Sequence, residues 1–295
     1  MTGALPVPAD DPGCRVELPE DAWRRCFVMD NRDGRDQVAG AVARHGWTGF
    51  ETPLPEYLYG VARSMPGLVI DVGSNTGFYS LLAASASARN TVLAFEPMAE
   101  IAARAHENAA RSGLEHRVLP RQVALGDRNG LAEFYVPDDA HGLVETSASL
   151  RRDFKGEPAA VRAVLSCRLD RVLLRSRWAA RRISLIKIDV EGHEAAVLNG
   201  ARWTIRLRRP VIFAEVLANA DLPWLNHFIR RRRYVDVKLG PGRLATPCDT
   251  VAHDDAAWNH ALVPQEKLAR FLAIGSSAPS RPVAGGCERS GVQAR

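Results

Sequence analysis

The chain has 295 residues, of which 46% are hydrophobic and 25% are charged, and its formal net charge is +5. This composition provides one sizeable core and excludes a transmembrane chain, because no apolar run approaches the roughly 20 residues of a membrane span. The mild basic excess favours a solvated surface over a nucleic-acid interface. Five cysteines without a C-x-x-C pair argue against a disulfide framework, and the first residues resemble no secretory leader, so we expect reduced thiols and a cytoplasmic protein.

The two ends of the chain differ from its middle. Residues 1–20 are rich in proline and aspartate, which predicts an irregular lead-in. Residues 21–66 are expected to form a helical segment that acts as a lid, and residues 67–274 are expected to form the main domain. The tail, residues 275–295, has almost no large apolar side chain and is expected to be disordered.

Short apolar runs alternate with helical patterns through the main domain. Runs that are apolar along their whole length suit strands covered on both faces, as in a parallel sheet, so the alternation predicts a doubly wound α/β fold. The expected strands are 68–72, 91–96, 184–190 and 210–216, and the expected helices are 76–88, 98–112 and 193–207.

One segment, residues 122–136, interrupts this alternation. Its Asn129-Gly130 pair is a strong turn signal between two β-prone runs and predicts a hairpin. The β-prone residues 161–169 are expected to join this hairpin. Two further strands are expected at 234–240 and 258–264.

The turn after the first strand, in LVIDVGSNTGFYS (68–80), contains Gly73 and Gly77. A dinucleotide fingerprint would need glycines where Asn75 and Phe78 stand, and no Gly-Lys-Ser/Thr follows for a P-loop. The turn is therefore a poor cradle for a diphosphate. Its plainest interpretation is a sharp strand-to-helix connection.

Two acids end neighbouring strands on the side where ligands bind in open α/β sheets. Asp71 ends the first strand, and Glu96 ends the second, where a carboxylate can accept hydrogen bonds from ribose hydroxyls. A nucleoside without phosphates fits this pair better than a dinucleotide does. We expect S-adenosylmethionine, because its sulfonium and amino groups are cationic and suit Asp71 and the turn carbonyls.

Five motifs follow one another along the chain: DVGSNTGFYS (71–80), FEP (95–97), VALGDRNG (123–130), IKIDVEGHEAAVLNGA (186–201) and AEV (214–216). In this order the chain resembles the FkbM-type methyltransferases, which are class I S-adenosylmethionine-dependent enzymes. The resemblance implies a Rossmann-like sheet of seven mostly parallel strands with one antiparallel edge strand and helices on both faces. It also implies methyl transfer, usually to a hydroxyl of a sugar, polyketide or other small metabolite.

The resemblance also assigns residues to the cofactor. Alanine is more usual in the place of Ser74, a small change. The cofactor's methionine end would contact Asp71, Gly73, Ser74, Asn75, Gly77 and Asp189, its ribose Glu96 and Pro97, and its adenine Ala124, Leu125 and Asp127.

Three acids, Asp189, Glu191 and Glu215, are expected to meet at the mouth of the cleft. A hydroxyl acceptor needs its proton removed, so Asp189 and Glu215 are candidate bases and substrate hydrogen-bonders. A second interpretation has the three acids hold Mg²⁺, which prefers oxygen ligands. In a third, Asp189 and Glu191 only brace the turn or cap the next helix. Lys187 is expected to point to the opposite face and to be structural.

His193 is another candidate base, because a helix N-terminus disfavours its cation and leaves the imidazole neutral. The alternative is a histidine that only hydrogen-bonds the turn. Residues 49–60 are expected to form a short helix that lids the pocket, with Glu51 and Tyr57 facing inward. The candidate substrate contacts are Glu51, Thr146, Ser147, Ser149 and Glu191.

The leading hypothesis is O-methylation of a small metabolite in secondary metabolism. The basic clusters 206–210 and 229–234 are expected to form solvated faces near helix ends, and the sharper interpretation is a site for an anionic acceptor. A glycosylated acceptor is also considered. An RNA methyltransferase and a non-catalytic S-adenosylmethionine-binding module are the rival functions, and the broken glycine pattern disfavours an NAD-dependent dehydrogenase. The sequence leaves open oxygen against nitrogen as the acceptor atom, metal dependence and a homodimer.

Overall fold

A computed structural model describes residues 13–20, 22–31, 34–137, 148–151 and 157–276. At its centre is an eight-stranded sheet with the order β12-β11-β13-β10-β9-β3-β4-β5. These strands are β3 (Leu68–Val72), β4 (Thr91–Phe95), β5 (Val118–Arg121), β9 (Ile183–Ile188), β10 (Val211–Glu215), β11 (Tyr234–Gly240), β12 (Leu244–Cys248) and β13 (Asn259–Pro264).

The sheet is mixed, and it differs in two ways from the expected seven strands with one antiparallel edge. The run β5-β4-β3-β9-β10 is parallel. The antiparallel strand β13 lies inside the sheet, between β10 and β11. An eighth strand, β12, forms the edge because the short Pro241–Arg243 turn folds it back along β11.

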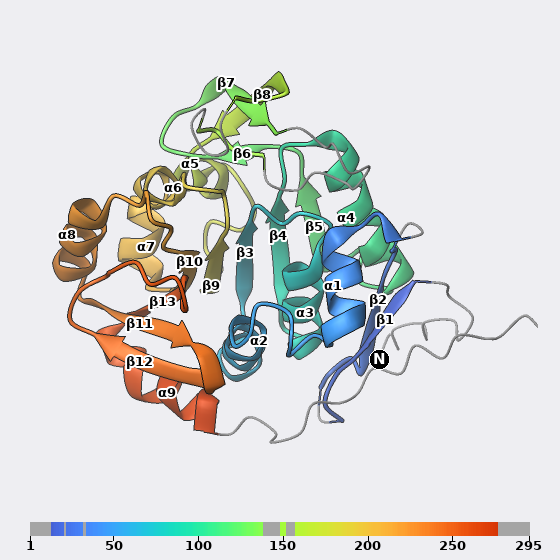
Figure 1. Ribbon diagram of the computed structural model, residues 1–295, viewed down its shortest axis with the longest axis horizontal. Coiled ribbons are helices and arrows are strands. Elements are labelled where there is room, and N and C mark those ends of the chain that lie inside the picture. Colours follow the sequence, from blue (N-terminus) through green and yellow to red (C-terminus); the bar gives the residue numbers. More distant parts are fainter. Residues whose placement is uncertain (1–12, 21, 32–33, 138–147, 152–156, 277–295) are drawn as a thin grey trace, which may run out of the picture.

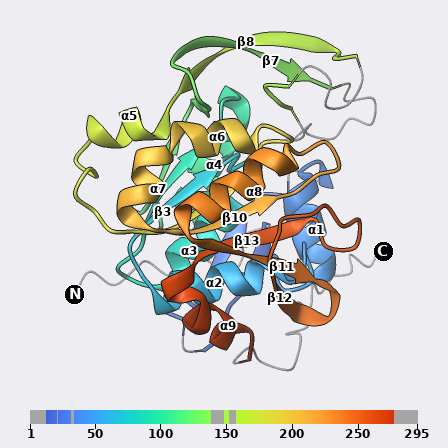
Figure 2. The same ribbon diagram turned by 90° about the vertical axis from the view of Figure 1, so that its left-hand side faces the viewer.

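Side chains of the central strands alternate between two cores, one on each face of the sheet. Val69, Leu185 and Phe213 face a core that contains α1 (Gln37–His45), α2 (Leu54–Ser64), α3 (Phe78–Ala86) and α9 (Leu268–Ser276), together with part of α4 (Ala99–Arg111). Their neighbours Ile70 and Ile186 face the other core. That core contains α5 (Leu169–Leu174), α6 (Glu194–Gly200), α7 (Arg202–Arg208) and α8 (Leu222–Arg232). Figures 1 and 2 show these two helical layers.

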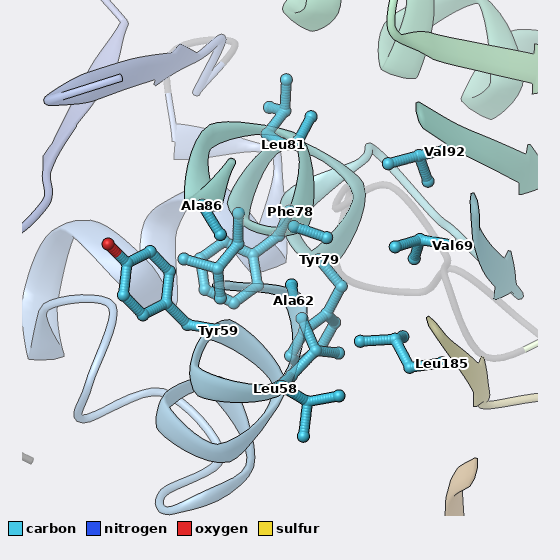
Figure 3. Packing of buried hydrophobic residues seen from close by; sticks show 14 of the residues in the cluster. Leu58, Tyr59, Ala62, Val69, Phe78, Tyr79, Leu81, Ala86, Val92 and Leu185 are labelled. Carbon is cyan, nitrogen blue, oxygen red and sulfur yellow. The ribbon is translucent and has the colours of Figure 1, made fainter. Parts of the chain in front are cut away.

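The interface between α2 and α3 fixes the helix that follows the glycine turn. Every residue of α3 is buried, so this helix is apolar all round and is enclosed by its neighbours. Phe78 and Tyr79 at its start pack near Leu58 and Leu185 (Figure 3). The first turn of α3 is therefore held rigidly beside the ends of the central strands.

The N-terminal segment is more ordered than its composition predicts. β1 (Cys14–Glu17) and β2 (Cys26–Met29) form an antiparallel pair, so the irregular lead-in expected over residues 1–20 is wrong at Cys14–Glu17. The pair is attached to α4, because Ser112 Oγ donates to the carbonyl of Val28 at 3.1 Å. The predicted lid segment contains β2 as well as α1 and α2. Residues 1–12 and 277–295 lie outside the described part, so the predicted tail is described only as far as Ser276, the last residue of α9.

A second, three-stranded sheet replaces the predicted hairpin. β6 (Ala124–Leu125) and β7 (Gly130–Val136) do not pair with each other, and both pair with β8 (Ala160–Cys167). The side chain of Asn129 accepts a hydrogen bond from the backbone of Arg168 at 3.1 Å, which ties the turn to the end of β8. Phe134 and Val164 pack on Met98 and Ile101 at the start of α4, so the small sheet stands above the large one (Figure 1). Across the described residues, no helix has the length and apolar character that crossing a bilayer requires.

Candidate active site

A cavity of about 450 Å³ opens at the carboxyl ends of β3, β4, β9 and β10. Its walls are the turn after β3, the start of α3, the helix α1 and the small sheet. Of the residues expected at the site, the cavity is lined by Glu51, Gly73, Ser74, Asn75, Glu96, Pro97, Ala124, Leu125, Asp189, Glu191, His193 and Glu215.

Five of the expected residues are described but do not line the cavity: Tyr57, Asp71, Gly77, Asp127 and Ser149. Thr146 and Ser147 lie outside the described residues. Ser149 is buried behind the wall, where its hydroxyl donates to the carbonyl of Glu191 at 2.9 Å. Tyr57 stacks on Phe271 in the core below the sheet.

The expected lid over residues 49–60 is therefore misplaced. The helix at the cavity is α1, which contributes Gln37, Val38, Ala41 and Arg44 to the lining. Asp36 caps this helix by accepting a hydrogen bond from the backbone N–H of Ala39 at 2.9 Å.

Asp71 supports the site from beneath. Its side chain is 1% exposed and accepts a hydrogen bond from Ser80 Oγ at 2.6 Å. Burial raises the pKa of this carboxyl, against the opposing charge of Lys187. Asp71 therefore points to Ser80 on α3 and is not part of the cavity lining, and its expected contact with the cofactor stays a prediction.

The two glycines of the turn serve the backbone. Gly73 has φ +71°, and a Cβ on it would lie 1.8 Å from the carbonyl oxygen of Asp189. Gly77 has φ +100° and starts α3. Asn75 between them also has a positive φ, 49°, which is unusual for a residue with a side chain. The turn therefore brings the β3 and β9 exits into contact, and the N–H groups of Gly73 and Ser74 tie it to the carbonyl of Phe95 at the end of β4.

Glu96 is held by that same turn. Its carboxylate accepts hydrogen bonds from the backbone N–H groups of Asn75 at 3.3 Å and Met98 at 3.0 Å. Burial outweighs these bonds and raises the pKa of Glu96 to about 7. The carboxylate remains part of the cavity wall, where its free lone pairs can accept from a diol.

One end of the cavity is apolar and the other is charged. The apolar end is formed by Phe95, Met98, Ile101, Ala124, Leu125 and Phe134. The charged end is formed by Glu51, Tyr79, Lys187, Asp189 and Glu215. Glu96 is a further acid in the wall of the cavity.

Lys187 is the main site residue that the sequence interpretation misplaced. Its ammonium lies 2.8 Å from Asp189 Oδ2 and 4.6 Å from the centre of the Tyr79 ring. Burial works against the charge, but Asp189, Asp71 and Glu51 together outweigh it and raise the pKa of Lys187. Lys187 is thus a permanent cation in the cavity wall.

The acids around Lys187 raise one another's pKa values. Glu51 accepts a hydrogen bond from the Tyr79 hydroxyl at 2.5 Å. Burial, reinforced by the charge of Asp189, raises the pKa of Glu51. The same two causes raise the pKa of Glu215 to about 10, so its carboxyl carries a proton at neutral pH.

A neighbouring acid, Glu194, performs the bracing considered for Glu191. Glu194 accepts hydrogen bonds from the backbone N–H groups of Val190 at 3.3 Å and Gly192 at 3.1 Å. Glu191 lines the cavity with φ +56°, as does Glu51 with φ +47°. Together with Asn75, these are the described non-glycine residues of positive φ at the cavity, a pattern common at functional sites.

His193 precedes α6 and makes no side-chain cap. Burial lowers its pKa, with the charge of Asp127 opposing, so the imidazole is neutral near pH 7. A Cβ on Gly126 would lie 3.1 Å from its Nε2, which places the ring beside the Ala124–Leu125 strand at the apolar end. His193 therefore lines the cavity next to Gly126, which follows β6.

The Mg²⁺ interpretation finds no support. Within the described ranges, no group of three or more His, Cys, Asp or Glu side chains is arranged to hold a metal ion. Asp189 instead pairs with the Lys187 ammonium, 2.8 Å from its Oδ2.

A model of the Methyltransferase FkbM domain matches residues 71–236, more than half of the chain. The chain belongs to the FkbM methyltransferase family. The match confirms the family that the resemblance indicated, a family of S-adenosylmethionine-dependent methyltransferases.

The chain is also similar, at 29% identity or less, to individual proteins. The AMB antimetabolite synthetase AmbE of Pseudomonas aeruginosa is 29% identical over 167 residues, which are 48% of this chain and 8% of that protein. A crystal structure of Methyltransferase FkbM from Methylobacillus flagellatus is 16% identical, with 76% of this chain and 54% of that one covered and a TM-score of 0.43. An O-methyltransferase from Bacillus cereus, solved with SAH, is 15% identical over 72% of this chain and 81% of that one, with a TM-score of 0.41.

The cavity of this FkbM-family chain fits the family's cofactor. Its apolar end offers the carbon-rich surface on which an adenine ring would pack, and the Glu96 carboxylate in the same wall would accept from ribose hydroxyls. The charged end has the acids that a sulfonium and an amino group favour. The residues that would hold the cofactor are Gly73, Asn75, Glu96, Met98, Ala124 and Leu125.

Proposed function

We propose that this FkbM-family enzyme methylates a hydroxyl group on a small metabolite, such as a sugar, a polyketide or another natural product. The observation that carries the proposal is the Lys187–Asp189 ion pair, buried in the wall of the cavity beside the Gly73 turn. The pair combines a proton acceptor with a fixed cation, which is what an alcohol needs in order to become a nucleophile.

When bound, S-adenosylmethionine supplies an electrophilic methyl group on a positively charged sulfur. Asp189 would accept the proton of the acceptor hydroxyl, whose oxygen would take the methyl group that the cofactor supplies. The Lys187 ammonium stabilises the negative charge that develops on the acceptor oxygen. Glu215 is not the base in this scheme, because with a pKa of about 10 it already carries a proton.

Positioning supplies much of the remaining rate. Holding the two reactants in line can lower a barrier by about 7–11 kcal/mol. The walls provided by α3, α1 and the small sheet support such alignment. A concave cavity of about 450 Å³ also suits a small acceptor better than a folded RNA, which would need a larger surface.

The experiment compares two variants of the pair with a matched control. Lys187→Met and Asp189→Asn are expected to lose turnover on a panel of hydroxylated metabolites and to keep binding S-adenosylhomocysteine in calorimetry. Lys238→Met is the control, since Lys238 makes a similar 2.9 Å pair with Asp254 away from the cavity. Full turnover by Lys187→Met would contradict the proposal. Cofactor binding by the wild type without turnover on any acceptor would favour a non-catalytic binding module instead.

A further inference from the structure

The cavity is acidic although the chain as a whole is basic. Among the described residues that line it, six carry a carboxyl group and two carry a fixed positive charge. The acids are Asp36, Glu51, Glu96, Asp189, Glu191 and Glu215, and the cations are Arg44 and Lys187. S-adenosylmethionine carries two cationic groups and one carboxylate, so it balances only one of the surplus acids.

Several of these acids already have partners. Asp36 caps α1, Glu96 accepts two backbone N–H groups, and Asp189 pairs with Lys187. Glu51 accepts from the hydroxyl of Tyr79. Glu215 differs from these four, because no described residue donates a hydrogen bond to its carboxyl group.

The surroundings of Glu215 select for a cation. It ends β10, partly buried, and the charges that face it are those of Asp189, Glu51 and Glu191, with Lys187 as the opposing one. A carboxyl in this position stays neutral until a positive group arrives, since burial and three acids both oppose its ionisation. A protonated amine would let Glu215 ionise and would form a charge-assisted hydrogen bond with it.

The arginine clusters of the sequence do not offset this acidity. Residues from 206–210 and 229–234 come together in a separate hollow lined by Arg202, Trp203, Arg206, Arg209, Arg231 and Arg232. None of them lines the cavity. The anionic acceptor that these clusters suggested therefore has no described basic wall at the site beyond Arg44 and Lys187.

We propose that Glu215, together with Glu51, binds a protonated amino group of the acceptor, so that the substrate class is a hydroxylated amine such as an amino sugar or an amino alcohol. This inference rests on the proposed methyl transfer to a hydroxyl and names its acceptor. An ammonium held by two carboxyl groups has no free electron pair. The methyl group therefore goes to the hydroxyl at Asp189, and the amine itself is spared.

The test uses acceptors that differ only in charge. Calorimetry on the protein loaded with S-adenosylhomocysteine compares two sets of three compounds. One set is 2-amino-1,3-propanediol, glycerol and glycerate, and the other is glucosamine, glucose and glucuronate. The amine of each set is expected to bind on the order of tenfold more tightly than its neutral counterpart, the gain typical of one hydrogen bond to a charged group.

Two variants assign the preference to its residue. Glu215→Gln keeps the shape of the neutral carboxyl, and it is expected to bind the amine and the neutral compound equally. Glu133→Gln, an exposed acid on the small sheet, is expected to keep the preference. S-adenosylhomocysteine is expected to bind the wild type and Glu215→Gln with the same affinity.

The outcomes separate this inference from the function beneath it. Equal binding of amine and neutral compounds by the wild type, or binding of none of the six, overturns the inference. A tenfold loss of S-adenosylhomocysteine affinity in Glu215→Gln also overturns it, because the acid would then serve the cofactor's amino group. Preferred binding of the amines without methylated product from any of them supports the inference and contradicts the proposed O-methylation.

Discussion

Glu96 couples the affinity for the cofactor to pH. Folding raises its pKa from 4.5 to about 7, so its contribution to stability is complete below about pH 4.5 and is lost as the pH rises through about 7. This rise of the pKa means that keeping the carboxylate of Glu96 ionised in the folded protein costs about 3 kcal/mol. Ribose hydroxyls that donate to this carboxylate offset that cost, so the cofactor prefers the ionised form.

The expected result follows from this linkage. Calorimetry should show S-adenosylhomocysteine binding about thirtyfold more weakly near pH 5.5 than near pH 8, because at the lower pH the carboxyl must first lose its proton. Glu96→Gln should weaken binding near pH 8 by about 1.5–3 kcal/mol, on the order of tenfold to a hundredfold, and should flatten the pH profile. An unchanged slope in Glu96→Gln, or full affinity of the wild type near pH 5.5, would refute the ribose assignment.

Two further predictions concern the walls of the cavity. Gly73→Ala should unfold at a much lower urea concentration than Gly242→Ala. Both glycines have φ +71°, but only a Cβ on Gly73 meets a neighbour, the Asp189 carbonyl oxygen at 1.8 Å. Equal urea midpoints of the two variants would show that the close approach relaxes without cost. Tyr79→Phe removes the donor to the buried carboxyl of Glu51, so we expect a loss of about 1–3 kcal/mol in the free energy of unfolding, measured with urea; a variant as stable as the wild type would contradict that pairing.

The sequence was a good guide wherever a site residue sits at a strand end. The carboxyl ends of parallel strands share one edge of a sheet, so Glu96, Asp189 and Glu215 were predicted at the cavity from apolar runs closed by acids. The two-residue period of a strand also indicates that Lys187 lies on the same face as Asp189, because residues two apart in a strand share a face. The sequence interpretation assigned it to the opposite face and so missed the ion pair with Asp189.

Other features depend on contacts that no local pattern reveals. The Asn129-Gly130 signal predicted that the strands on either side of it pair with each other, but both pair with β8, the strand that the sequence expected to join them. The helix at the cavity is α1 rather than α2. Most of α2 is buried beneath the sheet, where its Tyr57 stacks on Phe271. Tyr79 reaches Glu51 from the first turn of α3, a contact between elements that sequence spacing does not encode.

The most direct measurement of the central claim is a crystal structure of the protein with S-adenosylhomocysteine. We expect the nucleoside in the cavity above the Gly73 turn, with the adenine between Met98 and Leu125, the ribose hydroxyls on Glu96 and the sulfur directed at the Lys187–Asp189 pair. A ligand bound elsewhere, or a ribose that makes no hydrogen bond to Glu96, would contradict the assignment of this cavity as the methyl-transfer site.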